Sequence, residues 1–147
     1  MFNMPNFIDE QCFLGMGDVA LTASMEDYLE AIFEIGRQKS AVRVRDVARK
    51  LEVTMPSVTG ALKILEARGL LRHERYEYIE LTESGSVQAA LIASRHRIIR
   101  TFLTEVIGTD RSTADAEACG IEHILSSETM EKLTGYIERT IRESRHE

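Results

Sequence analysis

A short stretch near the C-terminus, residues 115–123, holds three side chains that could bind one metal ion. Cys119, Glu122 and His123 are spaced so that they would share one face of a helix, with Asp115 one turn earlier. A thiolate, a carboxylate and an imidazole are ligands for divalent transition metals. Three donors on one turn fill only part of a coordination sphere, so other helices must supply the remainder. The candidates for these further ligands are Asp27, Glu30 and His96.

Each candidate also has an ordinary structural explanation. A single Cys or His usually belongs to the core or the surface, and Glu30 could simply be exposed. Ser24 and Asp27 have the spacing of a capping box, so Asp27 could serve only to cap a helix over residues 24–38. The grouping of three donors with plausible partners elsewhere favours the metal hypothesis over these separate explanations.

Length and composition indicate an ordinary folded protein. The chain has 147 residues, of which 44% are hydrophobic and 29% charged, which suits one compact domain or two small domains sharing a core. It contains no apolar run of about 18 residues that could span a membrane, and residues 1–20 have no basic segment typical of a secretory signal. Of the two cysteines, Cys12 and Cys119, the second is better explained as a metal ligand in a reducing cytoplasm than as half of a disulfide.

The net charge of −6 hides one basic segment. Residues 1–36 contain seven acidic and no basic residues, residues 37–75 contain ten basic and four acidic residues, and residues 76–147 contain eight basic and thirteen acidic residues. A local basic excess of this kind indicates a surface that binds phosphates. The competing interpretation is a solvated face with unbalanced charge.

Residues 43–69 have the length, apolar pattern and turn of a helix-turn-helix. A short helix over about 43–51 is followed by a turn at 52–54, and Pro56 opens a second helix that stops at Gly69. We expect Val53 and Val58 to fill the angle between the two helices. The second helix would then present its polar face to the major groove of DNA.

Two short strands, at about 70–75 and 76–82, follow the second helix, and together they predict a winged helix. Arg72, His73 and Arg75 would meet phosphates at the wing, although an exposed hairpin also carries charges. The predicted DNA-contacting residues are Arg43, Arg45, Thr54, Met55, Pro56, Ser57, Thr59, Gly60, Lys63, Arg72 and Arg75.

The remaining sequence predicts helices over about 83–107, 112–125 and 127–143, capped by Thr82 and by Ser126 and Ser127. The last two have narrow apolar stripes and give one chain a thin core. A symmetric homodimer is therefore expected, against the alternative that both helices fold back on the long helix alone. The predicted fold is mainly α: an extension (1–20), a winged helix-turn-helix domain (21–84) and a helical metal-binding and dimerisation domain (85–147).

The sequence resembles the diphtheria toxin repressor family of metal-dependent repressors, most of all its short two-domain manganese-regulator branch. The resemblance covers about residues 21–142. It rests on residues 24–30, 56–59, 81–85, 95–97 and 119–123, in that order. It implies two adjacent metal positions, one formed by Asp27, Cys119, Glu122 and His123, the other by Glu30 and His96 with Glu122 bridging.

Several residues depart from the patterns of this family. Cys119 stands where the manganese branch has a glutamate and the iron branch a cysteine, and Asp27 stands where the iron branch has a methionine. Arg100 occupies a position that is acidic in the iron branch's ancillary site. Gly60 replaces the long polar residue that often reaches the bases, and the chain ends before the SH3-like third domain of longer members.

Together with the candidate site residues, this resemblance implies a cytoplasmic, homodimeric repressor that Fe²⁺ or Mn²⁺ activates to bind palindromic operators of metal-homeostasis genes. The thiolate favours Fe²⁺ slightly, while Zn²⁺, Co²⁺ and Ni²⁺ could also bind in vitro. Neither a membrane nor a small organic substrate is an expected partner. Two alternatives stay open: a winged-helix regulator of a non-metal signal, and a small metallohydrolase. The second is disfavoured because the sequence offers no separate base or nucleophile.

Overall fold

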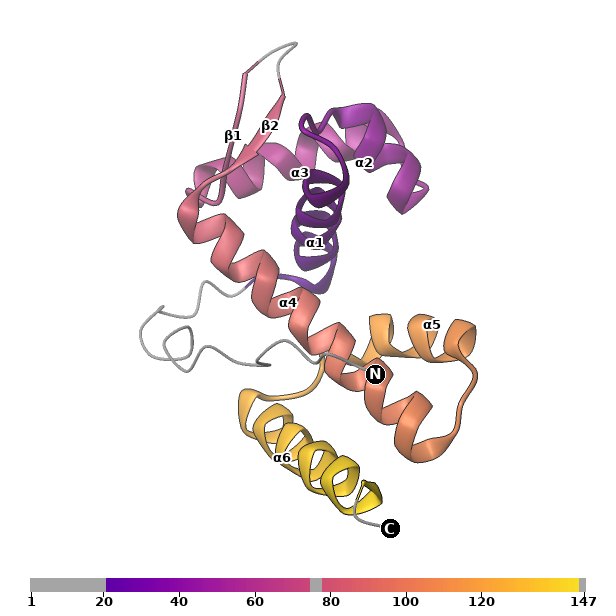
Figure 1. The fold of residues 1–147 in the computed structure, drawn as a ribbon. Helices are drawn as coiled ribbons and strands as arrows, with labels where there is room; N and C mark the ends of the chain where they lie inside the picture. The colour runs from indigo at the N-terminus through magenta and orange to yellow at the C-terminus, as the bar shows by residue number, and fades with distance from the viewer. Residues whose placement is uncertain (1–20, 75–77, 146–147) are drawn as a thin grey trace.

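The computed structural model describes residues 21–74 and 78–145, so the predicted extension and Arg75 lie outside the described residues. Its elements, in chain order, are α1 (Ala23–Gln38), α2 (Val44–Leu51), α3 (Met55–Ala67), β1 (Leu71–His73), β2 (Ile79–Leu81), α4 (Glu83–Thr101), the π-helical turn η2 (Phe102–Ile107), α5 (Arg111–Ile121) and α6 (Ser127–Ser144). The predicted class, a winged helix-turn-helix followed by a helical unit, is confirmed (Figure 1).

The winged-helix unit surrounds one apolar core. Helices α1, α2 and α3 pack together, and the antiparallel ribbon pairs Leu71 with Leu81 and His73 with Ile79. The fully buried side chains of this core include Leu29, Ile32, Val47, Val58, Leu62, Leu65, Leu70 and Leu71. Those on α1 and α3 recur at helical spacing, which is why these two segments are amphipathic helices.

Helix α4 leaves this unit and runs into the second one (Figure 1). Its first turn begins at Thr82, whose hydroxyl accepts a hydrogen bond from the Gly85 amide at 3.1 Å, as the predicted cap requires. A Cβ at Gly85 would overlap the backbone carbonyl of Leu70. Glycine at this position therefore lets α4 start directly against the end of the helix-turn-helix.

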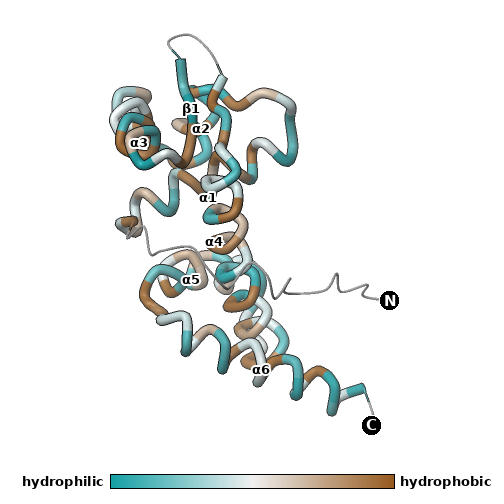
Figure 2. The backbone as a smooth tube through the Cα atoms, turned by 90° about the vertical axis from the view of Figure 1, so that its left-hand side faces the viewer, coloured by the Kyte–Doolittle hydropathy of each residue, from teal (hydrophilic) through white to brown (hydrophobic). Residues whose placement is uncertain are grey.

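The second unit has a smaller core, formed by α4, α5 and α6. Its buried residues are Ile98, Ile99, Ala118, Met130 and Ile137, with partly buried apolar residues such as Leu133 around them. Apolar residues recur at intervals along α6, with polar residues between them (Figure 2). Ile107, Ile124 and Tyr136 stay exposed, Ile124 by 81%. The apolar stripe predicted for the helix over 112–125, which includes Ile121, Ile124 and Leu125, is thus only partly covered within one chain.

Two local predictions in the winged-helix unit are wrong. The first helix starts at Ala23 and is capped by Thr22, which accepts a hydrogen bond from the Met25 amide at 3.3 Å, so neither Ser24 nor Asp27 caps it. Val53 is 37% exposed and does not fill the angle between α2 and α3, whereas Val58 is fully buried there. The preceding Glu52 adopts a left-handed conformation, with φ of 55°, which turns the chain outward.

Two later helices differ from prediction in their last turns. Helical structure after Thr82 ends at Ile107 before Gly108 (φ of 83°), as predicted, but its last turn, Phe102–Ile107, is π-helical instead of α-helical. Helix α5 ends at Ile121, with Glu122 as its C-cap, instead of continuing to residue 125. His123 therefore lies in the turn beyond the helix, a position that changes where its side chain can reach.

Candidate metal centre and DNA-binding face

Four segments converge where α4 meets α1 and α5. Helix α1 supplies Asp27 and Glu30, which lie three positions apart, and α4 supplies His96 near its middle. The end of α5 supplies Cys119 and Glu122, and the following turn supplies His123. Helix α4 packs against both α1 and α5, and this packing brings donors separated by about 90 residues of sequence together.

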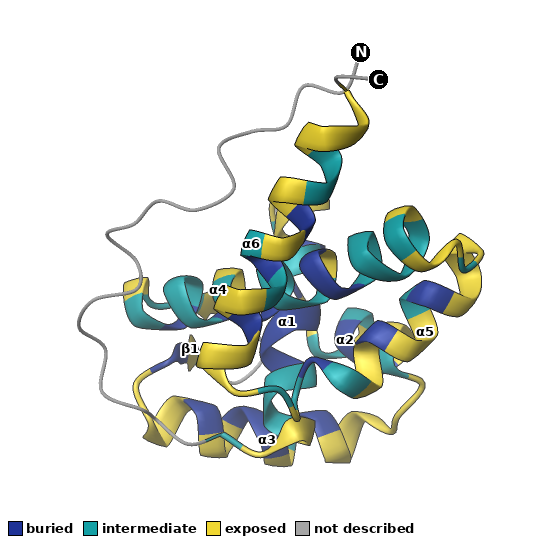
Figure 3. Cartoon of the chain, turned by 90° about the horizontal axis from the view of Figure 1, so that it is seen from below, coloured by how far each residue is buried: buried dark blue, intermediate teal, exposed yellow. Residues whose placement is uncertain are grey.

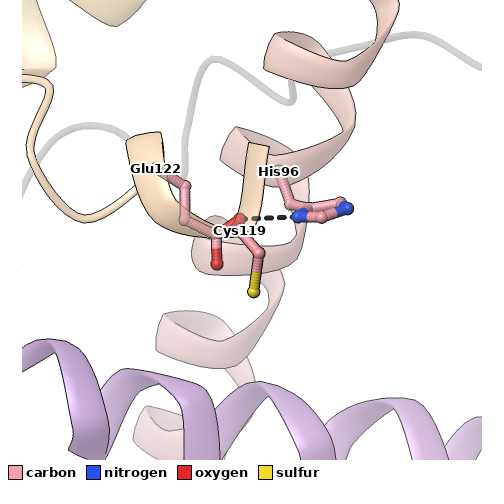
Figure 4. A group of neighbouring side chains, drawn as sticks. All are labelled: His96, Cys119 and Glu122. Carbon is pink, nitrogen blue, oxygen red and sulfur yellow. Dashed lines mark hydrogen bonds and ion pairs between the residues drawn. The ribbon is translucent and has the colours of Figure 1, made fainter. Parts of the chain in front are cut away.

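The first group consists of His96, Cys119 and Glu122 (Figure 4). One donor atom from each lies within 4.8 Å of the others. Nδ1 of His96 is 2.8 Å from Oε2 of Glu122, and the Cys119 thiol lies on the same side of α5 as the Glu122 carboxylate. An imidazole nitrogen, a thiol and a carboxylate thus share one small space.

The second group consists of Asp27, Glu122 and His123. Nε2 of His123 lies 2.7 Å from Oδ1 of Asp27 and 3.4 Å from Oε1 of Glu122. Glu122 therefore belongs to both groups, with Oε2 directed to one and Oε1 to the other. Glu30 belongs to neither group but lies beside them, and its charge interacts with those of Glu122 and His96.

Glu122 occupies the most enclosed position of the centre. It is 1% exposed, and its Oε1 atom has no hydrogen-bond partner among the described residues. Glu30, next to it, is 8% exposed. Burial of an incompletely satisfied carboxylate beside a second one is costly without a compensating cation. The donor set thus fits a divalent metal ion, which would supply that charge.

The acidity of the donors reflects the same crowding. Burial and the Glu122 charge raise the pKa of Glu30 to about 8, and the hydrogen bond with Glu122 raises the pKa of His96 to about 9. Burial and the neighbouring carboxylates raise the pKa of the Cys119 thiol to about 11. These protons must leave before the atoms can bind a metal, so metal binding should strengthen as pH rises.

Sequence reasoning missed two residues that touch this centre. Oε2 of Glu26 lies 2.6 Å from Nδ1 of His123. Oδ1 of Asp115, which the sequence placed near the cluster without a role, lies 3.2 Å from Nε2 of His96 and accepts a hydrogen bond from Arg100 at 3.0 Å. For Glu26 the available signal was its place one helical turn before Glu30. For Asp115 it was the turn preceding Cys119.

The outer side of α3 is the predicted reading face. Met55, Ser57, Gly60 and Lys63 are exposed on this side, and Figure 3 shows exposed positions along the length of α3. Two threonine hydroxyls here also make local bonds. Thr54 caps α3 by accepting a hydrogen bond from the Ser57 amide at 3.3 Å, and the Thr59 hydroxyl donates to the Met55 carbonyl at 3.1 Å. Pro56 and Thr54 are exposed at the start of the helix.

The predicted phosphate contacts around α3 have different surroundings. Arg45 on α2 and Arg72 on β1 are exposed. Arg43 instead lies with its guanidinium 5.2 Å from the centre of the Tyr78 ring and donates a hydrogen bond to the Tyr78 hydroxyl at 3.2 Å. This contact joins the start of α2 to the wing, a role that sequence reasoning did not foresee.

Two family profiles match adjoining parts of the chain. The N-terminal DNA-binding domain of iron-dependent repressors matches residues 20–79, and the metal-binding and dimerisation domain of iron-dependent repressors matches residues 82–145. The fold and the donor cluster define a metal-dependent DNA-binding regulator. The chain belongs to the iron-dependent repressor family, the diphtheria toxin repressor family expected from its motifs.

Individual relatives agree with this assignment. An uncharacterised helix-turn-helix regulator of Methanocaldococcus jannaschii is 36% identical over 81% of this chain and 96% of its own length. The regulator MntR of Shouchella clausii is 35% identical over 76% of this chain and 78% of its own length. Both are transcriptional regulators, in agreement with the expectation of a non-enzymatic protein.

Solved structures share the same arrangement of elements. The T. acidophilum IdeR structure superimposes with a TM-score of 0.68 at 30% identity, covering 78% of this chain and 53% of that one. A manganese-dependent transcriptional repressor in complex with manganese gives a TM-score of 0.72 at 25% identity, covering 78% and 52%. The chain thus spans about half the length of these structures.

Among the described residues, no helix combines the length and apolarity needed to cross a membrane.

Proposed function

We propose that this protein is a homodimeric repressor that binds palindromic operator DNA when Fe²⁺ or Mn²⁺ occupies the centre between α1, α4 and α5. The proposed metal ligands are Asp27, Glu30, His96, Cys119, Glu122 and His123. The observation that carries the proposal is the buried Glu122 carboxylate, whose two oxygens face two different donor groups. Membership of the iron-dependent repressor family supports it. As a regulator of DNA, the protein would act in the cytoplasm.

The proposed switch depends on which unit each ligand belongs to. Asp27 and Glu30 lie on α1, whose other face is part of the winged-helix core. Glu122 and His123 lie at the end of α5, and α5 packs on α4 in the second unit. A bound metal ion supplies the positive charge that lets these groups converge. The convergence would fix α1, and the reading helix packed on it, relative to the dimerisation unit.

DNA binding would then follow by selection of one arrangement. Two copies of α3 can enter successive major grooves only when their separation matches the half-site spacing of the operator. Lys63, Arg45 and Arg72 would contact phosphates, and the residues exposed at the start of α3 would face the bases. A free chain that samples several arrangements binds weakly, because only part of its population is competent.

Fe²⁺ is the proposed physiological metal, with Mn²⁺ as the competitor. A thiolate from Cys119 beside His96 and Glu122 favours Fe²⁺ over Mn²⁺, whereas a purely carboxylate and imidazole site suits either ion. Anaerobic calorimetric titration with each ion, on the native protein and on Cys119→Glu, would distinguish them. We expect the native protein to bind Fe²⁺ more tightly than Mn²⁺, and the variant to shift this preference toward Mn²⁺. Equal affinities in both proteins would contradict this preference.

The central test is selection of double-stranded DNA from a random pool by the metal-loaded protein. The enriched sequences should be palindromic, and EDTA should release them. Glu122→Ala should lose both metal binding and DNA binding, whereas Lys63→Ala should weaken DNA binding and retain the metal. Equal DNA binding by the metal-loaded and EDTA-stripped proteins would contradict the proposal and favour a regulator of a different signal.

A further inference from the structure

Both histidines of the centre engage both of their ring nitrogens, and they do so in opposite orientations. His96 directs Nδ1 to Glu122 at 2.8 Å and Nε2 to Asp115 at 3.2 Å. His123 directs Nε2 to Asp27 at 2.7 Å and Nδ1 to Glu26 at 2.6 Å. In each ring, one nitrogen faces the shared donor groups and the other faces a carboxylate outside them.

Asp115 is held in place by a cation. Its Oδ1 atom, which faces His96, also accepts a hydrogen bond from Nη1 of Arg100 at 3.0 Å. The guanidinium balances the carboxylate charge and fixes the oxygen that faces Nε2 of the imidazole. Asp115 therefore has the surroundings of an acceptor for an N–H group, and it belongs to neither donor group.

Glu26 has the corresponding place beside His123. It precedes Asp27 on α1, and its carboxylate reaches Nδ1, the nitrogen on the opposite side of the ring from Asp27. Because Glu26 lies on α1 and His123 follows α5, this contact also joins the two units of the molecule.

We propose that Asp115 and Glu26 are positioning residues that hold the two histidines in opposite tautomers. Asp115 keeps a proton on Nε2 of His96, so that Nδ1 is free to bind metal. Glu26 keeps a proton on Nδ1 of His123, so that Nε2 is free. A ligating histidine commonly donates its second N–H to a carboxylate, which fixes both the tautomer and the ring orientation. This inference rests on the ligand set of the proposed function.

The opposite orientations of the two rings meet at the shared Glu122. Its Oε2 atom faces Nδ1 of His96, and its Oε1 atom faces Nε2 of His123. The two rings thus present different nitrogens to the same carboxylate. The pairs Asp115 with His96 and Glu26 with His123 achieve this arrangement from two different helices.

The direct test is long-range ¹H–¹⁵N NMR of the full chain, labelled at histidine and loaded with Zn²⁺, a diamagnetic ion that nitrogen, oxygen and sulfur donors bind. We expect His96 to show a metal-bound Nδ1 with a protonated Nε2, and His123 to show the reverse. The same tautomer in both rings, or the reversed pattern, would overturn the inference but leave the ligand set intact. Zn²⁺ binding without a metal shift on either ring would contradict the ligand set itself.

Variants test the positioning role separately. Asp115→Ala and Glu26→Ala should each weaken Zn²⁺ affinity by about 10–100-fold, the usual effect of removing such a partner. Asp115→Asn and Glu26→Gln retain an acceptor oxygen and should recover most of the affinity and the native tautomers. Glu117→Ala, which removes an exposed carboxylate from the same helix as Asp115, is the matched control and should change neither. Equal loss in the alanine and amide variants would overturn the positioning role.

Discussion

The winged-helix unit and the helical unit differ in how they are held together. The first buries a large apolar core that includes Leu29, Leu62 and Leu65 from α1 and α3. The second buries a short row of apolar residues on α4, α5 and α6, and it leaves Ile107, Ile124 and Tyr136 exposed. Glu30 and Glu122, the two carboxylates buried within the described part of the chain, lie where the units meet.

This difference indicates where each unit obtains its stability. Apolar stabilisation scales with the buried area, so we expect the winged-helix unit to be stabilised mainly by its own apolar core. The helical unit buries less apolar surface. We expect charge neutralisation at the metal centre and contact with a second copy of the chain to supply the missing stability. Such an arrangement suits a sensor, because the less stable unit is the one that responds to its ligand.

The largest expected effect comes from a substitution that leaves a cavity in the core of the winged-helix unit. Leu65→Ala should lower the free energy of unfolding by about 2–5 kcal/mol, since Leu65 is fully buried and its removal leaves a cavity. Leu133→Ala, in the thinner core, should cost less because Leu133 is only partly buried. Denaturant titration of both metal-free variants measures the difference. A larger loss for Leu133→Ala would contradict the comparison of the two cores.

Metal removal should affect the other unit. At a free Mn²⁺ concentration 100 times its Kd, binding adds about 2.7 kcal/mol of stability, which chelation removes. Hydrogen-exchange protection should fall most in α5 and the middle of α4 and least in α2 and the ribbon. The Glu122→Ala variant, which should not respond to Mn²⁺, is the control. A uniform loss of protection over the whole chain would argue against separate sources of stability.

A change on the reading helix should act in the opposite direction. Gly60 lies within α3, and a Cβ there would have no atom within 4 Å. Gly60→Ala should therefore raise the free energy of unfolding by about 0.5–1 kcal/mol, because alanine loses less backbone entropy in a helix. Thermal denaturation of the metal-free protein measures this gain. A decrease would show that the position is less open than its surroundings indicate.

The last expected effect is a pH dependence that originates where the two units meet. The pKa of His96 is raised to about 9, so its stabilising contribution is complete below its ordinary pKa of 6.5 and is lost as pH rises to about 9. Glu30, with a pKa of about 8, acts in the same direction. The metal-free protein should lose stability over this range, and His96→Gln should lose less. Metal binding should instead strengthen as pH rises. The difference in stability between the metal-loaded and metal-free proteins should therefore grow with pH.

Much of the architecture could be predicted from local patterns. Apolar residues at helical spacing indicated α1, α3 and α6, and Pro56 and Gly69 marked the limits of the second helix of the helix-turn-helix closely. Thr82 and Ser126 cap α4 and α6 as expected. The helix ends were less well predicted. Thr22 caps α1 in place of Ser24, and α5 ends before residue 122. Several chemically suitable caps lie close together in sequence, and packing selects among them.

The sequence by itself determined the donor types and the spacing that puts Cys119 and Glu122 on one side of α5. It also determined the basic segment and the apolar pattern of the helix-turn-helix. Only the tertiary structure decided that His123 leaves α5 and turns toward α1, and that Glu26 and Asp115 face the second nitrogens of the two rings. It also decided that Arg43 lies on Tyr78. Helical periodicity specifies which residues share a face, whereas the partner of that face depends on how helices end and cross, and packing between distant segments sets both.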